Sequence, residues 1–480
     1  MKVSFRITPL VITFIIVALL SVGRGAPAGT ISFTLTGAIS PRDPSSADRE
    51  FIVPEGIAEI DVDCACADDQ STPPVDLGIR GPAGIRGWSP SGADHVHIDR
   101  ISASYGYLPG PIEPGRWHVM LGAVEPSDPD AAYTVTIKLS NGLDAPRQVL
   151  RIGSGWFAGD LHVHSGHSDG YQDGEGRHAP VLVRDLVALA ENAHLDFLAV
   201  TDHNTASHWI DVDRTQAAAP DLLLLHGREV TTARGHFNAV GERRFTDYRL
   251  NFGLPMPSLL SDVGSDGSFL SINHPWLKSD AWCAGCGWAD RDPKTIGSVA
   301  GVEVVNGSTP TSDGESPGWI WWADALNAGA RLVAVGGSDV HDPRGGGARL
   351  GYPSTVVWAS DLSEPAIVAG LKAGRVFLRS RVDPRAIVDL SATNGSVLVH
   401  MGEHIAPGVL TLSAHITGAD GQECRWIRRG AIIGSTHIPS DDAVVTLPVE
   451  AAPHDWFSVV VRDGGAWRLI SNAIYVDLRP

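Results

Sequence analysis

The chain has 480 residues, of which 43% are hydrophobic and 19% charged, a composition ordinary for a folded protein of about three domains. Its formal net charge is −18, and no run of lysine and arginine interrupts this acidity. A nucleic-acid or anionic-membrane partner would need a basic surface. We therefore expect neither of these partners.

The N-terminus has the pattern of a secretory signal peptide. Lys2 and Arg6 give a basic start, residues 9–20 form an apolar core, and small residues follow. We expect residues 1–28 to be removed, which leaves an exported chain, periplasmic or secreted, without a membrane span. An uncleaved anchor is the alternative, because residues 7–23 approach the length needed to cross a bilayer.

Both flanking regions alternate polar and apolar residues in short runs. Residues 29–152 contain such runs at 31–36 and 133–139, and residues 383–480 contain one at 409–416. Period-two alternation between turn-rich stretches is typical of antiparallel sheets. We therefore predict a β-sandwich at each end of the chain, the C-terminal one of the immunoglobulin-like type.

The middle region, residues 153–382, alternates apolar runs with amphipathic stretches. A helical pattern over 179–194 precedes an apolar run at 196–201, and further helices are expected at 318–329 and 363–373. Strand–helix alternation of this length indicates a parallel sheet or a barrel. The predicted fold class is therefore multidomain, with β, α/β and β regions in that order.

Five cysteines suit an exported protein with one or two disulfides. Cys283 and Cys286 lie in a glycine-containing loop, and we predict a disulfide between them. Cys64 and Cys66 are too close for an easy mutual bridge, and Cys424 makes the count odd. The pairing of these three stays open.

Six histidines and five carboxylates form short motifs between residues 160 and 341, most of them at the end of an apolar run. Neutral imidazole together with carboxylate is the ligand set of divalent ions such as Zn²⁺, Mn²⁺ and Fe²⁺. There are too many ligands for one ion, so we predict a site for two or three. The motifs are Asp160-Leu-His162-Val-His164 with Asp169, Thr201-Asp202-His203, Arg228-Glu229, Gly235-His236, Asn273-His274-Pro275 and Ser338-Asp339-Val-His341.

The spacing within the motifs favours convergence. His162 and His164 lie two apart on an expected strand end, so their side chains leave on the same face. Asp339 and His341 repeat this spacing, and Glu229 ends its own apolar run with two oxygens that can bridge two ions. Ligands at the carboxyl ends of parallel strands meet at one mouth.

In this order, the motifs resemble those of the PHP (polymerase and histidinol phosphatase) metallohydrolases, and most closely the exported branch that includes carbaryl hydrolases. The resemblance covers about residues 155–380. It implies a distorted seven-stranded β/α barrel that holds three divalent ions, here flanked by the β-sandwich domains. It also implies the ligands of each ion: His162, His164, Glu229 and Asp339 for the first, Glu229, His236 and His274 for the second, and Asp169, His203 and His341 for the third.

The predicted activity is hydrolysis of a small-molecule phosphomonoester or phosphodiester by a hydroxide held between two ions, with Glu229 as the bridge. Asp202 is a candidate to orient His203, with a turn or capping role as the alternative. Arg344 and Arg349 follow in a glycine-rich loop, where they are candidates either to capture a phosphate or to face solvent.

Two other functions stay open. Tryptophans gather in the middle region, and Trp276, directly after His274 and Pro275, would give an aromatic wall that suits a carboxyl ester or a carbamate. A non-catalytic protein that binds surface material through its β-sandwiches is the other alternative. A plausible ligand at every motif position argues against that second alternative.

Overall fold

The computed structural model describes most of the chain, and the signal peptide predicted at residues 1–28 lies outside the described residues. Within the described part, no helix is both long and apolar enough to cross a membrane. The described residues are 31–40, 48–66, 75–89, 95–99, 103–104, 106–123, 131–140, 149–174, 177–216, 218–250, 255–279, 283–290, 292–307, 316–345, 347–380, 383 and 385–477.

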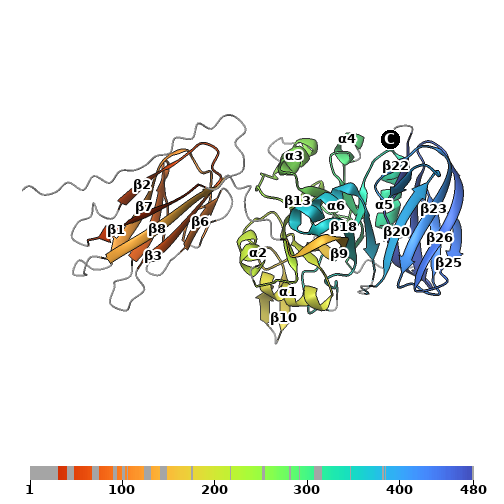
Figure 1. Ribbon diagram of the computed structural model, residues 1–480, viewed down its shortest axis with the longest axis horizontal. Coiled ribbons are helices and arrows are strands. Elements are labelled where there is room, and N and C mark those ends of the chain that lie inside the picture. The colour runs from red at the N-terminus through yellow and green to blue at the C-terminus, as the bar shows by residue number, and fades with distance from the viewer. Residues whose placement is uncertain are drawn as a thin grey trace, which may run out of the picture.

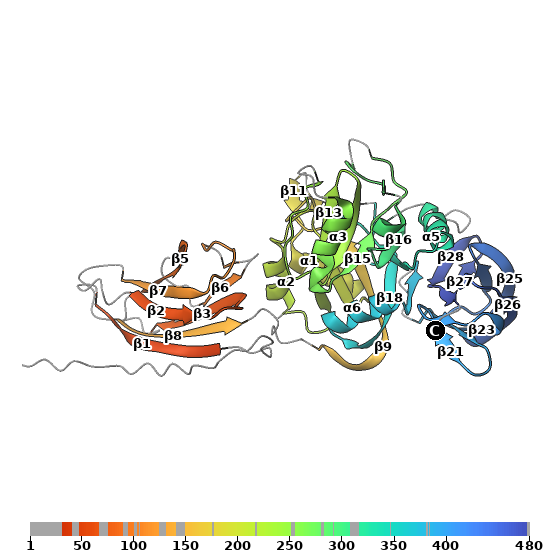
Figure 2. The ribbon, with the colours of Figure 1, turned by 90° about the horizontal axis from the view of Figure 1, so that it is seen from above.

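The N-terminal region consists of two four-stranded antiparallel sheets that stand apart from the rest of the molecule (Figures 1 and 2). Its strands are β1 (Ile31–Ile39), β2 (Asp48–Val53), β3 (Glu59–Cys66), β4 (Val75–Gly81), β5 (Gly84–Ser89), β6 (His95–Asp99), β7 (Gly115–Ala123) and β8 (Ala131–Ser140). The sheet orders are β1-β8-β3-β6 and β2-β7-β4-β5. Alternate residues of β2, β3, β4, β6, β7 and β8 face a shared apolar core, in which Ile60, Val62 and Trp117 are fully buried.

The central region carries the strands on which the candidate site is built. They are β9 (Arg151–Val163), β12 (Phe197–Val200), β13 (Leu223–Thr232), β14 (Gly235–Val240), β15 (Phe269–Ile272), β16 (Gly301–Asn306) and β17 (Val333–Gly337). β9, β12 and β13 are parallel neighbours, β14 runs antiparallel to both β13 and β15, and β15, β16 and β17 are again parallel. Every residue of β12, β14, β15 and β16 is buried, as expected for strands covered on both faces.

Helices cover this part of the sheet, and a separate hairpin projects from it. Ser316 begins one helix by accepting a hydrogen bond from the Trp319 amide, and Ser363 caps another in the same way through the Ala366 amide. The helices that match the predicted stretches are α1, α5 and α6. The elements are the hairpin β10 (Tyr171–Gly174) and β11 (Arg177–Pro180), and the helices α1 (Val183–Asn192), α2 (Trp209–Gln216), α3 (Met256–Val263), η3 (Gly264–Asp266), α4 (Pro293–Ile296), α5 (Pro317–Asn327) and α6 (Glu364–Ala373).

The expected closed seven-stranded barrel is not shown, because the sheet of the central region stays open. The reason lies in β9, whose first part pairs antiparallel with β18 (Ser354–Leu362), on the edge where a closing strand would lie. The segment after β17 still returns to the end of β9. The Asp339 amide donates to the His162 carbonyl at 2.8 Å, and the His164 amide donates to the Val340 carbonyl at 3.1 Å.

The C-terminal region is joined to the central one by a continuous sheet. After β18 the path runs through β19 (Val376–Arg379) into β28, so it crosses the boundary predicted near residue 382. The molecule is therefore mostly β-sheet and multidomain, and its second and third regions share backbone hydrogen bonds. The remaining strands are β20 (Ile387–Thr393), β21 (Leu398–His400), β22 (His404–Ile405), β23 (Gly408–Thr417), β24 (Glu423–Arg428), β25 (Ala431–His437), β26 (Asp442–Ala451), β27 (Trp456–Asp463), β28 (Ala466–Ser471) and β29 (Ile474–Val476).

Candidate metal centre

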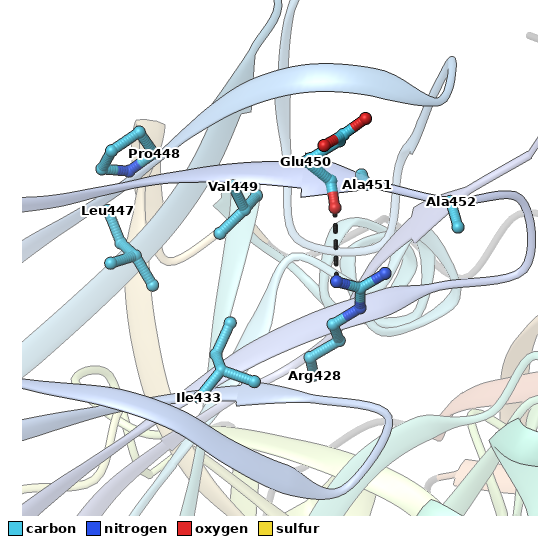
Figure 3. Close-up of a pocket in the computed structure, with 8 residues that line it drawn as sticks. All are labelled: Arg428, Ile433, Leu447, Pro448, Val449, Glu450, Ala451 and Ala452. Atoms are coloured by element: carbon cyan, nitrogen blue, oxygen red, sulfur yellow. Dashed lines mark hydrogen bonds between the residues drawn. The ribbon is translucent and has the colours of Figure 1, made fainter.

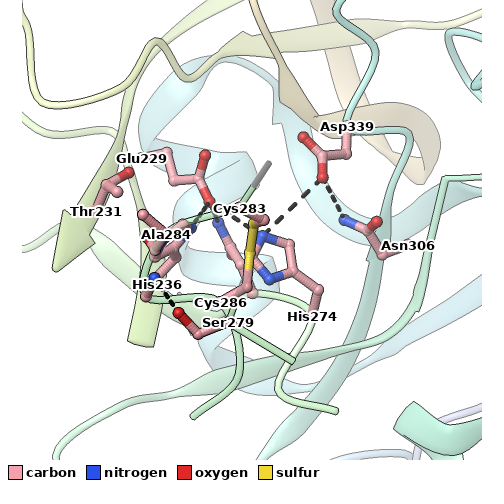
Figure 4. Close-up of a disulfide and its surroundings, with 12 residues drawn as sticks. Glu229, Thr231, His236, His274, Ser279, Cys283, Ala284, Cys286, Asn306 and Asp339 are labelled. Atoms are coloured by element: carbon pink, nitrogen blue, oxygen red, sulfur yellow. Dashed lines mark hydrogen bonds and ion pairs between the residues drawn. A yellow bond between two sulfur atoms is a disulfide. The ribbon is translucent and has the colours of Figure 1, made fainter. Parts of the chain in front are cut away.

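Nine histidine and carboxylate side chains meet where the central strands end, and we call them the central cluster. His162 ends β9, Glu229 and His236 lie on the paired strands β13 and β14, and His274 and Asp339 follow β15 and β17. Figure 4 shows four of these side chains turned toward one another: Glu229, His236, His274 and Asp339. The members of the central cluster are His162, His164, Asp169, His203, Glu229, His236, His274, Asp339 and His341.

The first group of the central cluster is enclosed except at Asp339, whose side chain is 20% exposed. His162 and Glu229 have no exposed surface. The Nε2 atom of His162 lies 3.2 Å from Glu229 Oε2 and 3.2 Å from Asp339 Oδ1. The Nε2 atom of His164 lies 3.1 Å from the same Asp339 oxygen and 3.5 Å from Glu229 Oε2. Two histidine nitrogens and two carboxylate oxygens therefore surround one point.

The protonation of His162 shows that this point suits a cation. Its other ring nitrogen, Nδ1, lies 2.7 Å from Glu303 Oε1, and this hydrogen bond places the ring proton on Nδ1. Nε2 then faces two carboxylate oxygens. Neither Nε2 of His162 nor Oε2 of Glu229 has a hydrogen-bond partner among the described residues. Because the two carboxylates repel one another unless positive charge lies between them, this point fits either a proton on Nε2 or a divalent ion that replaces it.

The second group is arranged around the other oxygen of Glu229. Oε1 lies 3.2 Å from His236 Nδ1 and 3.3 Å from His274 Nε2. Nε2 of His236 lies 3.1 Å from the Ala284 carbonyl oxygen, to which it donates, and this contact turns Nδ1 toward the carboxylate. The two oxygens of Glu229 thus belong to different groups, as a bridging ligand requires.

The third group lies at the mouth and is more exposed. Asp169, whose side chain is 55% exposed, has one oxygen 3.4 Å from His341 Nε2 and the other 3.6 Å from His203 Nε2. His203 also approaches the bridging Glu229, since its Nδ1 lies 2.9 Å from Oε2, the oxygen of the first group. His164 Nδ1 lies 3.8 Å from Asp169. All nine predicted ligands are therefore brought together.

The charges of the central cluster shift its pKa values in opposite directions. Burial alone lowers the pKa of His162, yet the negative charges of Asp339, Glu303 and Glu229 raise it well above its ordinary value. Burial raises the pKa of Glu229, but the positive charges of His203 and His162 hold it well below its ordinary value. The cluster therefore has ionised carboxylates that require positive charge beside them.

His164 differs from its neighbours. Burial, followed by the charges of His341 and His203, lowers the pKa of His164 to about 4 despite its hydrogen bond to Asp339. The ring is therefore neutral near pH 7, which is the form that binds a metal.

Glu303 and Asn306, which the sequence motifs did not single out, hold the ligands in place together with Asn273 of the motif Asn273-His274-Pro275. Glu303 accepts hydrogen bonds from His162 Nδ1 and, through its other oxygen, from the His274 amide at 2.9 Å. Asn273 donates to Glu229 Oε1 at 2.9 Å, and Asn306 donates to Asp339 Oδ2 at 3.2 Å. The only sequence signal for Glu303 and Asn306 was that each is a lone polar residue in the apolar run at 301–306.

Asp202 does not contact the imidazole of His203 in the described contacts. Its carboxylate accepts hydrogen bonds from the amide and hydroxyl of Ser165 at 2.9 and 2.6 Å and from the hydroxyl of Ser168 at 2.6 Å, and it lies 3.3 Å from His208 Nδ1. These contacts fold the loop that presents His164 and Asp169. The turn interpretation of Asp202 is therefore favoured over direct orientation of His203.

Arg344 and Arg349 are exposed, and none of the described contacts joins either guanidinium to the central cluster. Trp276 is half-buried, and its ring packs against the backbone of Gly318 in α5. Trp276, Ile320 and Trp321 line a pocket of about 510 Å³. An aromatic surface therefore begins two residues after His274.

The disulfide predicted between Cys283 and Cys286 is present. Cys64 is also disulfide-bonded, and Cys424 is a free, buried thiol in the core of the C-terminal region.

A second pocket, of about 610 Å³, lies in the C-terminal region between β25 and β26 (Figure 3). The guanidinium of Arg428 there donates to the Glu450 carbonyl, and no histidine lines it. The histidines and carboxylates that could act on a substrate therefore lie in the central cluster and not in this pocket.

Comparison with known proteins finds similarity only to solved structures, and at low sequence identity. No family model and no curated protein matches the sequence. Among solved structures, the chain is similar to a two-domain protein from Bacteroides vulgatus that contains a predicted PHP-like metal-dependent phosphoesterase, with 19% identity, a TM-score of 0.39, and coverage of 69% of this chain and 98% of that one. It is also similar to an amidohydrolase from Chromobacterium violaceum, with 16% identity, a TM-score of 0.28, and coverage of 38% and 88%. The case for a function rests on the geometry of the central cluster.

Proposed function

We propose that the protein is a metal-dependent hydrolase, with phosphoesters as its substrates and two or three divalent ions held by the central cluster. One observation carries this proposal: the oxygens of the buried Glu229 and the partly buried Asp339 face histidine nitrogens in an arrangement that only a proton or a cation can make favourable. His162, His164, Glu229 and Asp339 would hold the first ion. Glu229, His236 and His274 would hold the second, and Asp169, His203 and His341 the third.

When bound, such ions supply Lewis-acid charge and lower the pKa of water toward neutrality. The chain's own residues keep the site rigid. Glu303 fixes the ring of His162 and the backbone at His274, while Asn273 holds the bridging carboxylate through its side-chain amide. The half-exposed side of the cluster, at Asp169 and His341, is where a substrate would enter. We further propose that the mature protein is exported and acts on small molecules.

Hydrolysis of a carboxyl ester or carbamate is the second candidate. The pocket lined by Trp276, Ile320 and Trp321 favours it, because an aryl group would bury apolar surface there. Phosphoesters offer more charge for three metal groups to neutralise, and we place them first for that reason.

The test is hydrolysis of bis-p-nitrophenyl phosphate, p-nitrophenyl phosphate and 1-naphthyl acetate by protein loaded with Zn²⁺, Mn²⁺ or Fe²⁺. We expect activity on at least one phosphate ester, lost in Glu229→Gln and kept in Glu450→Gln, a matched change at an exposed position of β26. Activity on the acetate alone would favour the second candidate. Equal activity of wild type and Glu229→Gln would contradict a hydrolase centred on this cluster.

A further inference from the structure

The disulfide Cys283–Cys286 lies directly against the second group of the central cluster. Figure 4 shows its sulfur bridge beside the rings of His236 and His274. The sulfur of Cys286 and one nitrogen from each of these histidines all lie within 4.8 Å of one another. Cys286 is only 4% exposed, so its sulfur faces the two histidines and has almost no contact with solvent.

The loop that carries Cys286 is held in place by contacts other than the disulfide. Nε2 of His236 donates to the Ala284 carbonyl at 3.1 Å, and the Gly285 amide donates to the Ser279 hydroxyl at 2.9 Å. Gly285 has φ +85°, and a Cβ there would lie 2.0 Å from the Thr232 carbonyl oxygen. The Trp288 amide donates to the Pro275 carbonyl at 3.1 Å. Cys286 therefore stays beside the histidines when the sulfur–sulfur bond is broken.

We propose that Cys286 is a latent sulfur ligand of the second metal group, withheld by the disulfide and released by reduction. This inference rests on the proposed function, because it requires that His236 and His274 hold an ion. A tetrahedral zinc site with these ligands needs sulfur–nitrogen separations of about 3.5 Å. In the disulfide form these separations are at most 4.8 Å, so the sulfur of Cys286 has to approach each nitrogen by no more than about 1.3 Å, which rotation about its Cα–Cβ bond can supply once it is freed from Cys283.

The chemical step is thiol–disulfide exchange with a dithiol reductant. The reductant gives up two hydrogen atoms and closes its own disulfide, while the bond between Cys283 and Cys286 breaks and each sulfur gains one hydrogen. When an ion binds, the Cys286 thiol releases its proton to solvent and the sulfur coordinates as thiolate.

Reduction would change which ion the second group prefers. In the disulfide form the group offers only imidazole and carboxylate, which suit Mn²⁺ and Fe²⁺ as well as Zn²⁺. With the thiolate added, it becomes a mixed sulfur and nitrogen site, and such sites select thiophilic ions. The redox state of the loop would thus set the metal content of the protein.

Cobalt substitution tests the proposal in the full chain, because thiolate-bound Co²⁺ has a near-ultraviolet charge-transfer band that nitrogen and oxygen ligands do not give. Cys283→Ser and Cys286→Ser are a matched pair, since both remove the disulfide but only Cys283→Ser keeps sulfur beside the histidines. Wild type is measured as purified and after reduction with dithiothreitol, which is removed before Co²⁺ is added. The buried Cys424 is common to all samples.

We expect the charge-transfer band in Cys283→Ser and in reduced wild type, and its absence in Cys286→Ser and in oxidised wild type. The ratio of Zn²⁺ to Mn²⁺ affinity should rise in the first pair by on the order of tenfold or more. Normal cobalt d–d bands in every sample with no charge-transfer band would overturn the sulfur ligand and leave the proposed function intact. Failure of wild type to bind Co²⁺ in either redox state would overturn both.

Discussion

Two gatherings of histidines and carboxylates among the described residues differ in burial. One is the central cluster, in which His162 and Glu229 are wholly enclosed. The other, which we call the outer ladder, lies on the outward face of β3 and β6 and consists of Glu59, Asp61, Asp63, His95, His97 and Asp99. In the outer ladder the side chains of Asp61 and His97 are 21% and 23% exposed.

The two groups also differ in how their charges are matched. In the outer ladder, antiparallel register places Asp61 opposite His97 and Asp63 opposite His95, and the closest contacts are 2.9 and 2.7 Å. Lys138 adds a further ion pair with Asp63 at 2.9 Å. Each histidine thus finds a carboxylate locally, and water screens the rest.

In the central cluster, by contrast, a single carboxylate serves several histidines. Glu229 lies within 3.5 Å of nitrogens from five of them, and these come from separate strands and loops. Glu59, Asp61 and His97 of the outer ladder also have atoms within 4.8 Å of one another. The comparison teaches that ligand types can lie close together in two different settings, and we infer that burial and convergence on one point mark the central cluster as the metal centre.

The largest effect is expected for Asp339→Asn. This change removes the charge that faces both His162 and His164, so the first ion loses a ligand in an enclosed site. Metal affinity, measured by competition with a chromogenic chelator, should fall by more than about a hundredfold, beyond the usual loss for residues that only support ligands. Asp61→Asn in the outer ladder is the matched control and should leave metal content unchanged. Similar losses from both changes would remove the distinction between the two groups.

Glu303→Gln should have the next largest effect. The amide keeps the size of the side chain but no longer holds the His162 ring with a charged acceptor, which weakens that histidine as a ligand. We expect metal affinity or hydrolytic rate to fall by about 10- to 100-fold while the fold is retained. Glu59→Gln serves as its counterpart in the outer ladder. A Glu303→Gln protein with wild-type affinity would show that the hydrogen bond is only structural.

His226 provides a case of a partly buried histidine without convergence, since its side chain is 20% exposed. It lies between Asp213, 2.9 Å from its Nε2, and Glu364, 3.2 Å from its Nδ1, and Arg243 pairs with Glu364 on the other side. Burial lowers the pKa of His226, but Asp213 and Glu364 raise it to about 10, above its ordinary value of 6.5. A histidine pKa raised by folding stabilises the folded state fully below pH 6.5, and this contribution is lost as the pH rises toward 10.

His226→Gln should therefore lower the free energy of unfolding by about 2 kcal/mol at pH 6, the scale of a hydrogen bond to a charged group. The difference from wild type should shrink as the pH is raised to 10, as followed by urea denaturation. Metal content should not change. A difference that is constant across this pH range would show that the charge on His226 contributes nothing.

The smallest effect is expected in the outer ladder itself. His97→Gln removes an ion pair with Asp61 on the outward face of a sheet, where partly exposed pairs contribute about 1 kcal/mol or less. Thermal unfolding should shift by only a few degrees, and metal content should stay the same. A loss of bound metal in His97→Gln would mean that the outer ladder is a second metal site.

The parts predictable from the sequence were those encoded by local pattern. His162 with His164 and Asp339 with His341 lie two residues apart at strand ends, so one short motif fixes both side chains of each pair. Glu303 and Asn306 were missed because each stands alone in an apolar run, and only the distant pairing of β16 with β17 brings them to the ligands. The open sheet was equally invisible, since the register of β18 against β9 joins residues about 200 positions apart.

The most direct test of the central claim is elemental analysis of metals in wild-type protein purified without chelator. We expect two or three divalent ions per chain, reduced in Asp339→Asn and unchanged in Asp61→Asn. Folded wild-type protein that contains no divalent metal, and takes up no Zn²⁺, Mn²⁺ or Fe²⁺ when these are added, would contradict the account.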